Sequence, residues 1–215
     1  MSHDRLTVLN EIAVQRVMHM FHTEDPSTAT KVLDSVHAGG GRVVEFTNRA
    51  RFATSVFDAL RRHVDDTHPD MIIGVGSVED APTASRFIAA GAEFIVSPIF
   101  DAATADLCNL RKIPYLPGTQ TVTEIATAER SGVEYVKLYP ATDPSFITLV
   151  QLPRPWSRII ANGMITPDTV GSWLDAGATA VGTMAGVPPT AIAEGDYDTI
   201  TAAVAAMAKA IGDHQ

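Results

Sequence analysis

The sequence predicts a single-domain (β/α)8 barrel, and three observations support that fold class. Short runs of β-branched and other apolar residues recur eight times, each followed by turn residues and an amphipathic segment, the alternation typical of βα units. In a chain of 215 residues, eight such units leave no linker and no room for a second domain. The first run ends in His-Thr-Glu-Asp at 22–25, without the glycine-rich phosphate turn of an open doubly wound sheet, so a closed barrel is favoured.

The predicted elements follow this alternation in order along the chain. A short helix is expected at the N-terminus, before the first strand. Several later helices end at a glycine, which suits the left-handed backbone of a helix C-cap. The predicted strands are 14–21, 42–46, 71–74, 94–96, 113–116, 135–139, 158–161 and 178–181. The predicted helices between and after them are 26–37, 51–64, 81–90, 104–110, 123–131, 167–175 and 197–210.

The charge balance argues against polyanionic partners. Acidic residues outnumber basic ones, 25 to 16, and the formal net charge is −9, with no run of Lys or Arg. Nucleic acids and anionic membranes attract proteins through clustered positive charge. We therefore expect neither nucleic acid nor membrane as a partner.

Cysteine usage and the N-terminal composition predict a cytoplasmic protein. Cys108 is the single cysteine, so no intrachain disulfide can form. The first twenty residues mix charges instead of carrying an apolar signal core. The uncharged stretch 176–193 contains glycines and prolines that interrupt it, so a buried strand followed by a loop explains it better than a membrane span.

Lys137 differs from the other three lysines because it lies inside a strand-like pattern, Tyr-Val-Lys-Leu-Tyr-Pro at 135–140. Burial in apolar surroundings favours the neutral amine, which is the form that attacks a ketone. The alternative is a structural lysine, held in a buried ion pair or reaching solvent from an edge strand. The barrel favours a functional lysine, because strand ends at one face of this fold carry the chemistry.

A second group of polar residues marks the end of the strand predicted at 42–46. Strand alternation places Glu45, Thr47 and Arg49 on one side. A plain salt bridge explains an acid beside an arginine as well as a functional site does. In a functional site, the same residues supply a general acid–base and a guanidinium that binds a carboxylate.

Five sequence blocks occur in a specific order. They are Gly-Gly-x-Arg-x-x-Glu-x-Thr-x-Arg at 39–49, Gly-Val-Gly-Ser-Val at 74–78, Gly-Ala-Glu-Phe-Ile-Val-Ser-Pro at 91–98, Ile-Pro-Tyr-Leu-Pro-Gly at 113–118 with Thr121, and Val-Lys-Leu-Tyr-Pro-Ala at 136–141. In this order they resemble the KDPG/KHG aldolases, class I lyases acting on 2-keto-3-deoxy-6-phosphogluconate and 4-hydroxy-2-oxoglutarate. The resemblance runs from residue 14 to the C-terminus and includes Glu-Gly-Asp-Tyr at 194–197.

The resemblance implies roles for individual residues. Lys137 matches the Schiff-base lysine, and Glu45 matches the carboxylate that transfers protons. Arg49 matches a substrate-binding arginine, and Ser77 stands where the family generally has a threonine near the substrate carboxylate. The candidate substrate-binding residues are Arg49, Thr47, Ser77, Pro98, Thr121 and, where the family often has an arginine, His22.

Two loops depart from the family pattern. The family's Pro-Thr-Gly-Gly-Ile after strand seven is Ala-Asn-Gly-Met-Ile at 161–165, and its Gly-Gly-Ser after strand eight is Gly-Thr-Met at 182–184. In the family these loops bind phosphate through N–H groups and a hydroxyl. Met164 and Met184 are expected to make the site smaller and less polar, so that phosphorylated substrates are poorly favoured. The candidates for rebuilding an anion site there are Asn162, Gly163, Gly182 and Thr183.

The resemblance also implies the reaction. A class I aldolase of this family cleaves a 2-oxo-4-hydroxy acid to pyruvate and an aldehyde. Here the substrate is 2-keto-3-deoxy-6-phosphogluconate, 4-hydroxy-2-oxoglutarate or an unphosphorylated relative such as 2-keto-3-deoxygluconate. Family members are TIM barrels that usually form homotrimers, so we expect a homotrimer with no cofactor and no metal.

Three other functions stay open. A barrel that binds a 2-oxo acid without turning it over would keep the lysine, and a phosphosugar isomerase or epimerase on the same fold is disfavoured by the altered loops. A metal-dependent lyase needs convergent ligands, whereas His19 and His22, at a spacing of three in a strand, point to opposite faces. We interpret His37, His63, His68 and His214 as surface residues.

Overall fold

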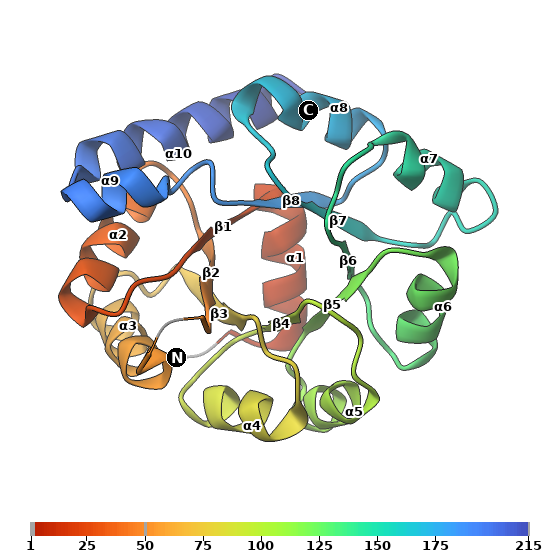
Figure 1. Ribbon diagram of the computed structural model, residues 1–215, viewed down its shortest axis with the longest axis horizontal. Coiled ribbons are helices and arrows are strands. Elements are labelled where there is room, and N and C mark those ends of the chain that lie inside the picture. Colours follow the sequence, from red (N-terminus) through yellow and green to blue (C-terminus); the bar gives the residue numbers. More distant parts are fainter. Residues whose placement is uncertain (1–2, 50, 215) are drawn as a thin grey trace.

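A computed structural model describes residues 3–49 and 51–214, and these residues form a closed barrel of eight parallel strands ringed by helices (Figure 1). This confirms the predicted (β/α)8 fold. Each strand pairs with the next one in sequence, and β1 pairs with β8 to close the ring. The strands are β1 (Val17–Phe21), β2 (Val43–Thr47), β3 (Ile72–Gly76), β4 (Ile95–Ser97), β5 (Tyr115–Thr119), β6 (Val136–Leu138), β7 (Ile159–Asn162) and β8 (Ala180–Thr183).

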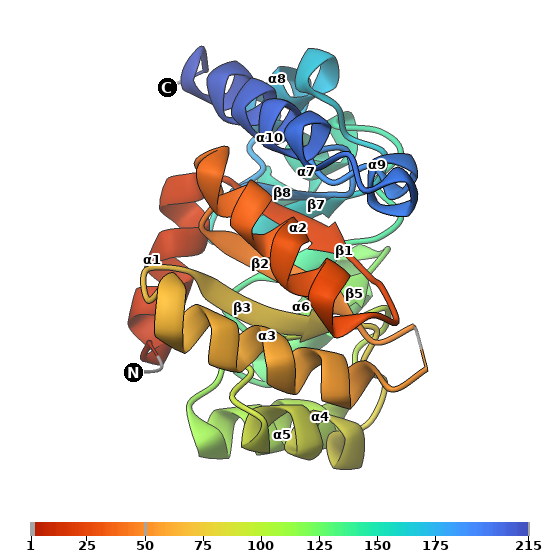
Figure 2. The ribbon, with the colours of Figure 1, turned by 90° about the vertical axis from the view of Figure 1, so that its left-hand side faces the viewer.

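Helix α1 (Arg5–Gln15) crosses one end of the barrel, and the other helices pack around its outside (Figures 1 and 2). Val8, Leu9 and Ile12 of α1 are buried against the apolar side chains that fill the barrel interior. This end is therefore plugged, and the opposite end, where the strands finish, is left for chemistry. The outer helices are α2 (Pro26–Ala38), α3 (Ala53–Thr67), α4 (Ala81–Ala89), α5 (Ala102–Arg111), α6 (Val122–Arg130), α7 (Ser145–Gln151), α8 (Pro167–Asp175), α9 (Pro189–Glu194) and α10 (Tyr197–Gly212).

Some element boundaries differ from the prediction. Val14 does not begin the first strand; it lies in α1 and is 65% exposed, because the helix continues until Arg16 adopts a left-handed C-cap. Strand β5 continues through Pro117 and Gly118, although these residue types usually end a strand. Helices α7 and α9 were not predicted, because segments of seven and six residues are too short to show helical periodicity.

The uncharged stretch 176–193 contains β8, a loop and the start of α9. The predicted strand and following loop are thus present. In the described part of the chain, no helix combines the length and the apolar character needed to cross a membrane.

His19 is buried on the helix-facing side of β1, where neither ring nitrogen has a hydrogen-bond partner among the described residues. Two glycines leave space for its ring. A Cβ on Gly41 would lie 2.9 Å from Cδ2, and one on Gly186 would lie 2.3 Å from Nδ1. Burial disfavours the charged imidazolium and lowers the pKa of His19 to about 4.

This burial predicts that the protein loses stability in mild acid. Above pH 6.5 the ring is neutral in the folded and unfolded chain, whereas below it the unfolded chain binds a proton that the folded chain binds only near pH 4. The free energy of unfolding should therefore fall by about 3 kcal/mol between these limits. The free energy of unfolding can be measured by denaturant titration at fixed protein concentration. Over this pH range it should fall by about 3 kcal/mol less in His19→Leu than in the wild type. The same pH dependence of the unfolding free energy in the wild type and in His19→Leu would contradict the lowered pKa of His19.

Candidate active site

Lys137 and Glu45 face each other inside the barrel. Lys137 lies on β6 and Glu45 on β2, on opposite walls of the ring. The Lys137 ammonium donates a hydrogen bond to Glu45 Oε2 at 3.1 Å, and the two residues are 6% and 2% exposed. Lys137 thus forms the buried ion pair expected of a structural lysine. Its partner, however, is Glu45, the residue predicted to transfer protons.

Two glycines make this arrangement sterically possible. A Cβ on Gly76 would lie 1.8 Å from Glu45 Oε1, so any larger residue there would displace the carboxylate. Gly118 is the register neighbour of Lys137 on β5, and a Cβ on it would lie 2.0 Å from the backbone oxygen of Pro98. Both glycines stand in the sequence blocks at 74–78 and 113–118, where close approach gives a physical reason for them.

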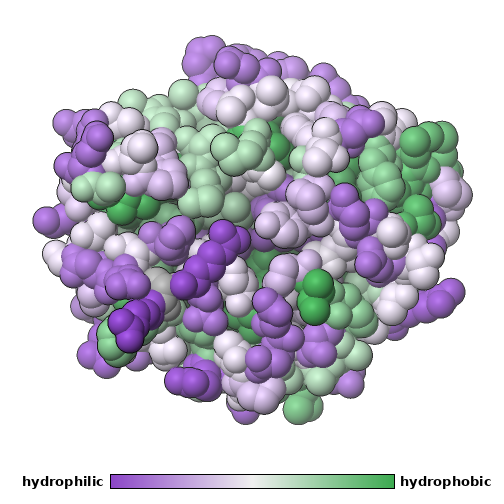
Figure 3. All heavy atoms as spheres, in the orientation of Figure 1, coloured by the Kyte–Doolittle hydropathy of each residue, from purple (hydrophilic) through white to green (hydrophobic). Residues whose placement is uncertain are grey.

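A cavity of about 40 Å³ lies beside the ion pair at the C-terminal ends of the strands. Figure 3 views the molecule from this side, where hydrophilic and apolar side chains are interspersed. Beneath the cavity the barrel interior is apolar down to α1. Groups that react in this cavity would therefore be shielded from bulk water on the side that faces the apolar barrel interior. The cavity is lined by Met20, Glu45, Arg49, Ser77, Ser97, Pro98, Lys137, Tyr139 and Asn162.

Arg49 and Ser77 form part of the cavity wall just beyond β2 and β3. Arg49 Nε donates a hydrogen bond to Ser77 Oγ at 3.0 Å. Ser77 has a φ of +58°, a left-handed conformation that is uncommon for a residue with a side chain. A guanidinium and a hydroxyl in contact are suited to binding a carboxylate.

Ser97 and Tyr115 position Pro98, and this network was not predicted from the sequence. Ser97 Oγ lies 2.6 Å from the Tyr115 hydroxyl and donates a hydrogen bond to the backbone oxygen of Ile99 at 2.5 Å. The Tyr115 hydroxyl also accepts a hydrogen bond from the Asp101 N–H at 3.1 Å. Burial raises the pKa of Tyr115, which keeps the phenol neutral and able to donate.

Asn162, at the end of β7, lines the cavity, and its Oδ1 is buried with no hydrogen-bond partner among the described residues. Gly182 on the neighbouring strand β8 leaves room for it, since a Cβ there would lie 2.3 Å from Oδ1. Buried polar atoms almost always have a partner. A bound hydroxyl donor would satisfy this one. Met20 on β1 lines the cavity as well, although it was not among the predicted site residues. Its inward position follows from strand alternation, which points Met18 and Met20 to the barrel interior.

The loops after β7 and β8 use several of their polar groups internally. The Gly163 N–H donates to the backbone oxygen of Gly182 at 3.2 Å. The Thr183 hydroxyl donates to the backbone oxygen of Ile165 at 2.7 Å and accepts from the Ala185 N–H at 3.0 Å. Met164 is 90% exposed and so does not fill the site, contrary to the expectation that both methionines shrink it.

Three candidate residues lie close to the strand ends without lining the cavity. Thr47 is buried and donates a long hydrogen bond, 3.4 Å, to the backbone oxygen of Phe21. Thr121 is the N-cap of α6, where it forms a capping box with Glu124. His22 is exposed just after β1.

A larger hollow adjoins the cavity and shares Pro98 and Tyr139 with it. Its volume is about 360 Å³, and it extends from β5 over the start of α6. Its polar lining includes Thr119, Gln120 and Thr123. Tyr139, which is 39% exposed, therefore lines both spaces.

The arrangement supports nucleophilic and acid–base chemistry. A lysine amine becomes a nucleophile when a nearby base takes its proton, and Glu45 is within hydrogen-bond distance. Arg49 and Ser77 provide a place for a substrate carboxylate at the edge of the same cavity. Four residues predicted from the sequence thus line the same cavity, namely Glu45, Arg49, Ser77 and Lys137.

Comparison with known proteins gives a consistent family. A family model described as KDPG and KHG aldolase matches residues 8–203. The 2-dehydro-3-deoxy-phosphogluconate aldolase of Treponema pallidum is 28% identical over 201 residues, which cover 92% of this chain and 94% of that protein. The enzyme of the same name from Pseudoalteromonas atlantica is 30% identical over 194 residues, which cover 83% of each chain.

A solved structure supports the same fold. The KDPG aldolase of Legionella pneumophila, captured with pyruvate as a covalent carbinolamine intermediate, superposes with a TM-score of 0.85. It is 24% identical, and the match covers 95% of this chain and 98% of that one. Since the family model spans nearly all of a barrel whose lysine and glutamate meet at the strand ends, this chain belongs to the KDPG and KHG aldolase family and is a carbon–carbon lyase.

Proposed function

We propose that the protein is a class I aldolase that cleaves a 2-oxo-4-hydroxy acid to pyruvate and an aldehyde, with Lys137 as the Schiff-base residue. The observation that carries the proposal is the buried contact of 3.1 Å between Lys137 Nζ and Glu45 Oε2 at the mouth of the barrel. An amine with an adjacent carboxylate has the two groups that Schiff-base aldol chemistry requires.

The first half of the reaction forms the iminium. Glu45 takes a proton from the Lys137 ammonium, and the neutral amine attacks the C2 carbonyl to give a carbinolamine. Glu45 then returns its proton to the C2 hydroxyl, which leaves as water. Arg49 and Ser77 hold the substrate carboxylate, so that binding energy places C2 next to the amine.

The second half of the reaction breaks the C3–C4 bond. The Glu45 carboxylate removes the proton of the C4 hydroxyl, the bond electrons move into the iminium, and an aldehyde and an enamine result. Glu45 then protonates C3, and water hydrolyses the iminium to release pyruvate and Lys137. Asn162 Oδ1, which lines the cavity and has no hydrogen-bond partner among the described residues, would accept a hydrogen bond from a substrate hydroxyl.

We expect weak discrimination between phosphorylated and unphosphorylated forms of one sugar acid. The Gly163 N–H and the Thr183 hydroxyl already have partners inside their own loops. Each charge-assisted contact to a phosphate is worth about 1.5–3 kcal/mol, or roughly a 10- to 100-fold preference. With two such contacts missing, kcat/KM should favour the phosphorylated acid by less than about 100-fold.

The test measures pyruvate release from 2-keto-3-deoxygluconate and from its 6-phosphate under identical conditions. A preference above about a thousandfold for the phosphate, the effect of two such contacts, would show that these loops still bind the anion. Release of no pyruvate from either acid or from 4-hydroxy-2-oxoglutarate would contradict the proposed substrate class.

A homotrimer is the proposed assembly. It rests on the family resemblance and on exposed apolar side chains near α7, where Leu149 and Leu152 are 62% and 75% exposed and Figure 3 shows an apolar patch. Light scattering should then give about three times the chain mass of 22.9 kDa. Leu152→Glu should lower that mass if α7 lies in the contact. A wild-type mass of one chain would contradict a trimer.

A further inference from the structure

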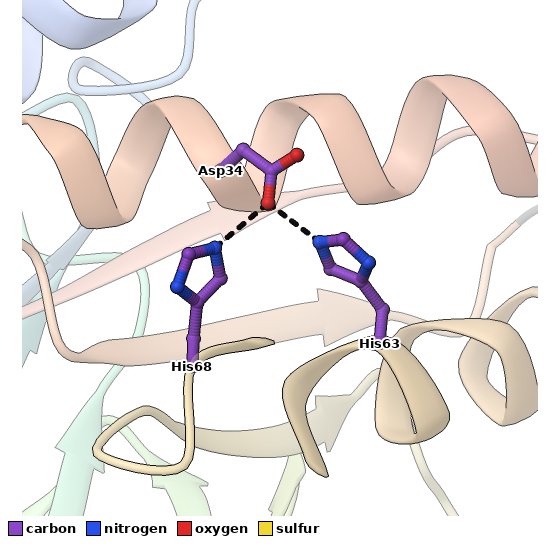
Figure 4. A group of neighbouring side chains, drawn as sticks. All are labelled: Asp34, His63 and His68. Atoms are coloured by element: carbon purple, nitrogen blue, oxygen red, sulfur yellow. Dashed lines mark hydrogen bonds and ion pairs between the residues drawn. The ribbon is translucent and has the colours of Figure 1, made fainter. Parts of the chain in front are cut away.

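Three side chains on the outer wall of the barrel form a cluster of metal-binding atoms. Asp34 comes from α2, His63 from α3, and His68 is the C-cap of α3 (Figure 4). Asp34 Oδ1 lies 2.5 Å from His63 Nε2 and 2.8 Å from His68 Nε2. All three donor atoms lie within 4.8 Å of one another. The histidines interpreted as separate surface residues are thus brought together by the packing of α2 on α3.

We propose that Asp34, His63 and His68 bind a divalent transition-metal ion, with zinc as the best fit. Two imidazole nitrogens and a carboxylate oxygen are ligands that zinc prefers, and a water completes a tetrahedron. Bond lengths near 2.1 Å place neighbouring donors about 3.3 Å apart in such a site. To reach that spacing, the contact of Asp34 with His63, now 2.5 Å, needs to lengthen by about 0.8 Å, and the contact with His68, now 2.8 Å, by about 0.5 Å.

The partial exposure of the cluster suits an incoming ion. The side chains of Asp34, His63 and His68 are 48%, 23% and 18% exposed, so the rings are held by packing while the carboxylate faces solvent. A bound metal would take the lone pair of each Nε2 and so replace the present contacts of both rings with Asp34 Oδ1. The net charge of −9 favours cation approach.

The surroundings of His68 hold its ring in place. The His37 ring stacks on it with centroids 4.1 Å apart, and His37 Nε2 lies 3.1 Å from Asp70 Oδ1. Arg42 forms an ion pair with the same Asp70 at 2.7 Å. His68 Nδ1 is buried without a hydrogen-bond partner among the described residues, so the surrounding protein leaves this ring incompletely satisfied.

The site is structural, because it lies away from the strand ends that carry Lys137. Asp34 and His63 lie in the second half of α2 and α3, and outer helices of a barrel run opposite to the strands. The cluster is therefore near the end that α1 closes. A metal there would join α2 to α3 and stabilise the fold without entering the aldol reaction.

The test uses the full chain, without a histidine tag, in Co²⁺ and Zn²⁺ titrations. Co²⁺ should produce visible absorption bands of a low-coordinate site with one equivalent bound, and Zn²⁺ should displace it. At about a hundred times its Kd, Zn²⁺ should raise Tm by roughly 5–10 °C. His63→Gln and His68→Gln should each weaken binding by at least about 100-fold and remove the Tm rise, while pyruvate production stays at the wild-type rate.

His214→Gln is the matched control, because His214 pairs with Asp175 at 3.4 Å and belongs to no group of three metal-binding side chains among the described residues. This variant should bind both ions as the wild type does. Absence of a one-equivalent Co²⁺ spectrum in the wild type would overturn the proposal. So would unchanged binding in both His63→Gln and His68→Gln, because the ion would then be held elsewhere.

Discussion

Replacing Lys137 with alanine should abolish aldol cleavage, because Lys137 is the only lysine among the described residues that line the cavity. The other lysines, Lys31, Lys112 and Lys209, are exposed on the outside of the molecule. Loss of the nucleophile removes the covalent step entirely, so pyruvate release should fall to the uncatalysed rate. Steady-state assays with any substrate that the wild type cleaves would measure the loss.

The control must separate lost chemistry from lost stability. Removing one partner of a buried ion pair costs about 3–5 kcal/mol, so Lys137→Ala is expected to be less stable than the wild type. The double variant Lys137→Met with Glu45→Gln keeps the volume and removes both charges. It should recover the wild-type Tm approximately and remain inactive. Cleavage by the double variant would contradict the role of Lys137.

Glu45→Gln should separate iminium formation from proton transfer. With Lys137 intact, the variant should still form an adduct with pyruvate at high pH, where the amine is neutral without help. Exchange of the pyruvate methyl protons in heavy water should slow by roughly 10²- to 10⁴-fold, the usual contribution of a general acid–base. Proton NMR of pyruvate measures this exchange directly.

Glu93→Gln provides the matched comparison for this experiment. Glu93 is a second buried glutamate, 1% exposed, and it accepts hydrogen bonds from Arg61 at 2.8 Å and from the Ile73 N–H at 3.0 Å. Its loss should lower stability and leave the exchange rate unchanged in the remaining folded protein. Unchanged exchange in Glu45→Gln would assign the proton transfer to another group.

Periodicity was sufficient to predict the fold, because each βα unit carries its own local pattern. Eight apolar runs separated by amphipathic segments specify the barrel without knowledge of any contact. Boundaries were harder. Pro117 and Gly118 are residue types that usually end a strand. They nevertheless continue β5, where Gly118 approaches the Pro98 backbone more closely than a residue with a side chain could.

The site was predictable where one strand pattern carried the information. Lys137 in an apolar strand and Glu45 beside Arg49 are visible in the sequence, and the barrel brings them together. Thr121 was expected to contact substrate, and its hydroxyl caps α6. The neighbouring sequence alone does not distinguish a threonine that contacts substrate from one that caps a helix.

Contacts between distant segments were not predictable from one sequence. Ser97 meets Tyr115 across β4 and β5, and Asp34 meets His63 and His68 across two helices. In each case the partners are far apart in the chain, and only the packing of neighbouring elements defines their distance. These are the contacts that position Pro98 and build the proposed metal site.

Borohydride reduction in the presence of pyruvate, followed by peptide mass spectrometry, is the sharpest test of Lys137 as the Schiff-base residue. Hydride traps the iminium as a stable secondary amine and leaves a 1-carboxyethyl group on the lysine that formed it. We expect this group on the peptide containing Lys137, only when pyruvate is present, and together with loss of cleavage activity. Modification of Lys31, Lys112 or Lys209 instead, or no pyruvate-dependent adduct, would contradict this expectation; an adduct at Lys137 in a protein that cleaves no 2-oxo-4-hydroxy acid would indicate a binding barrel.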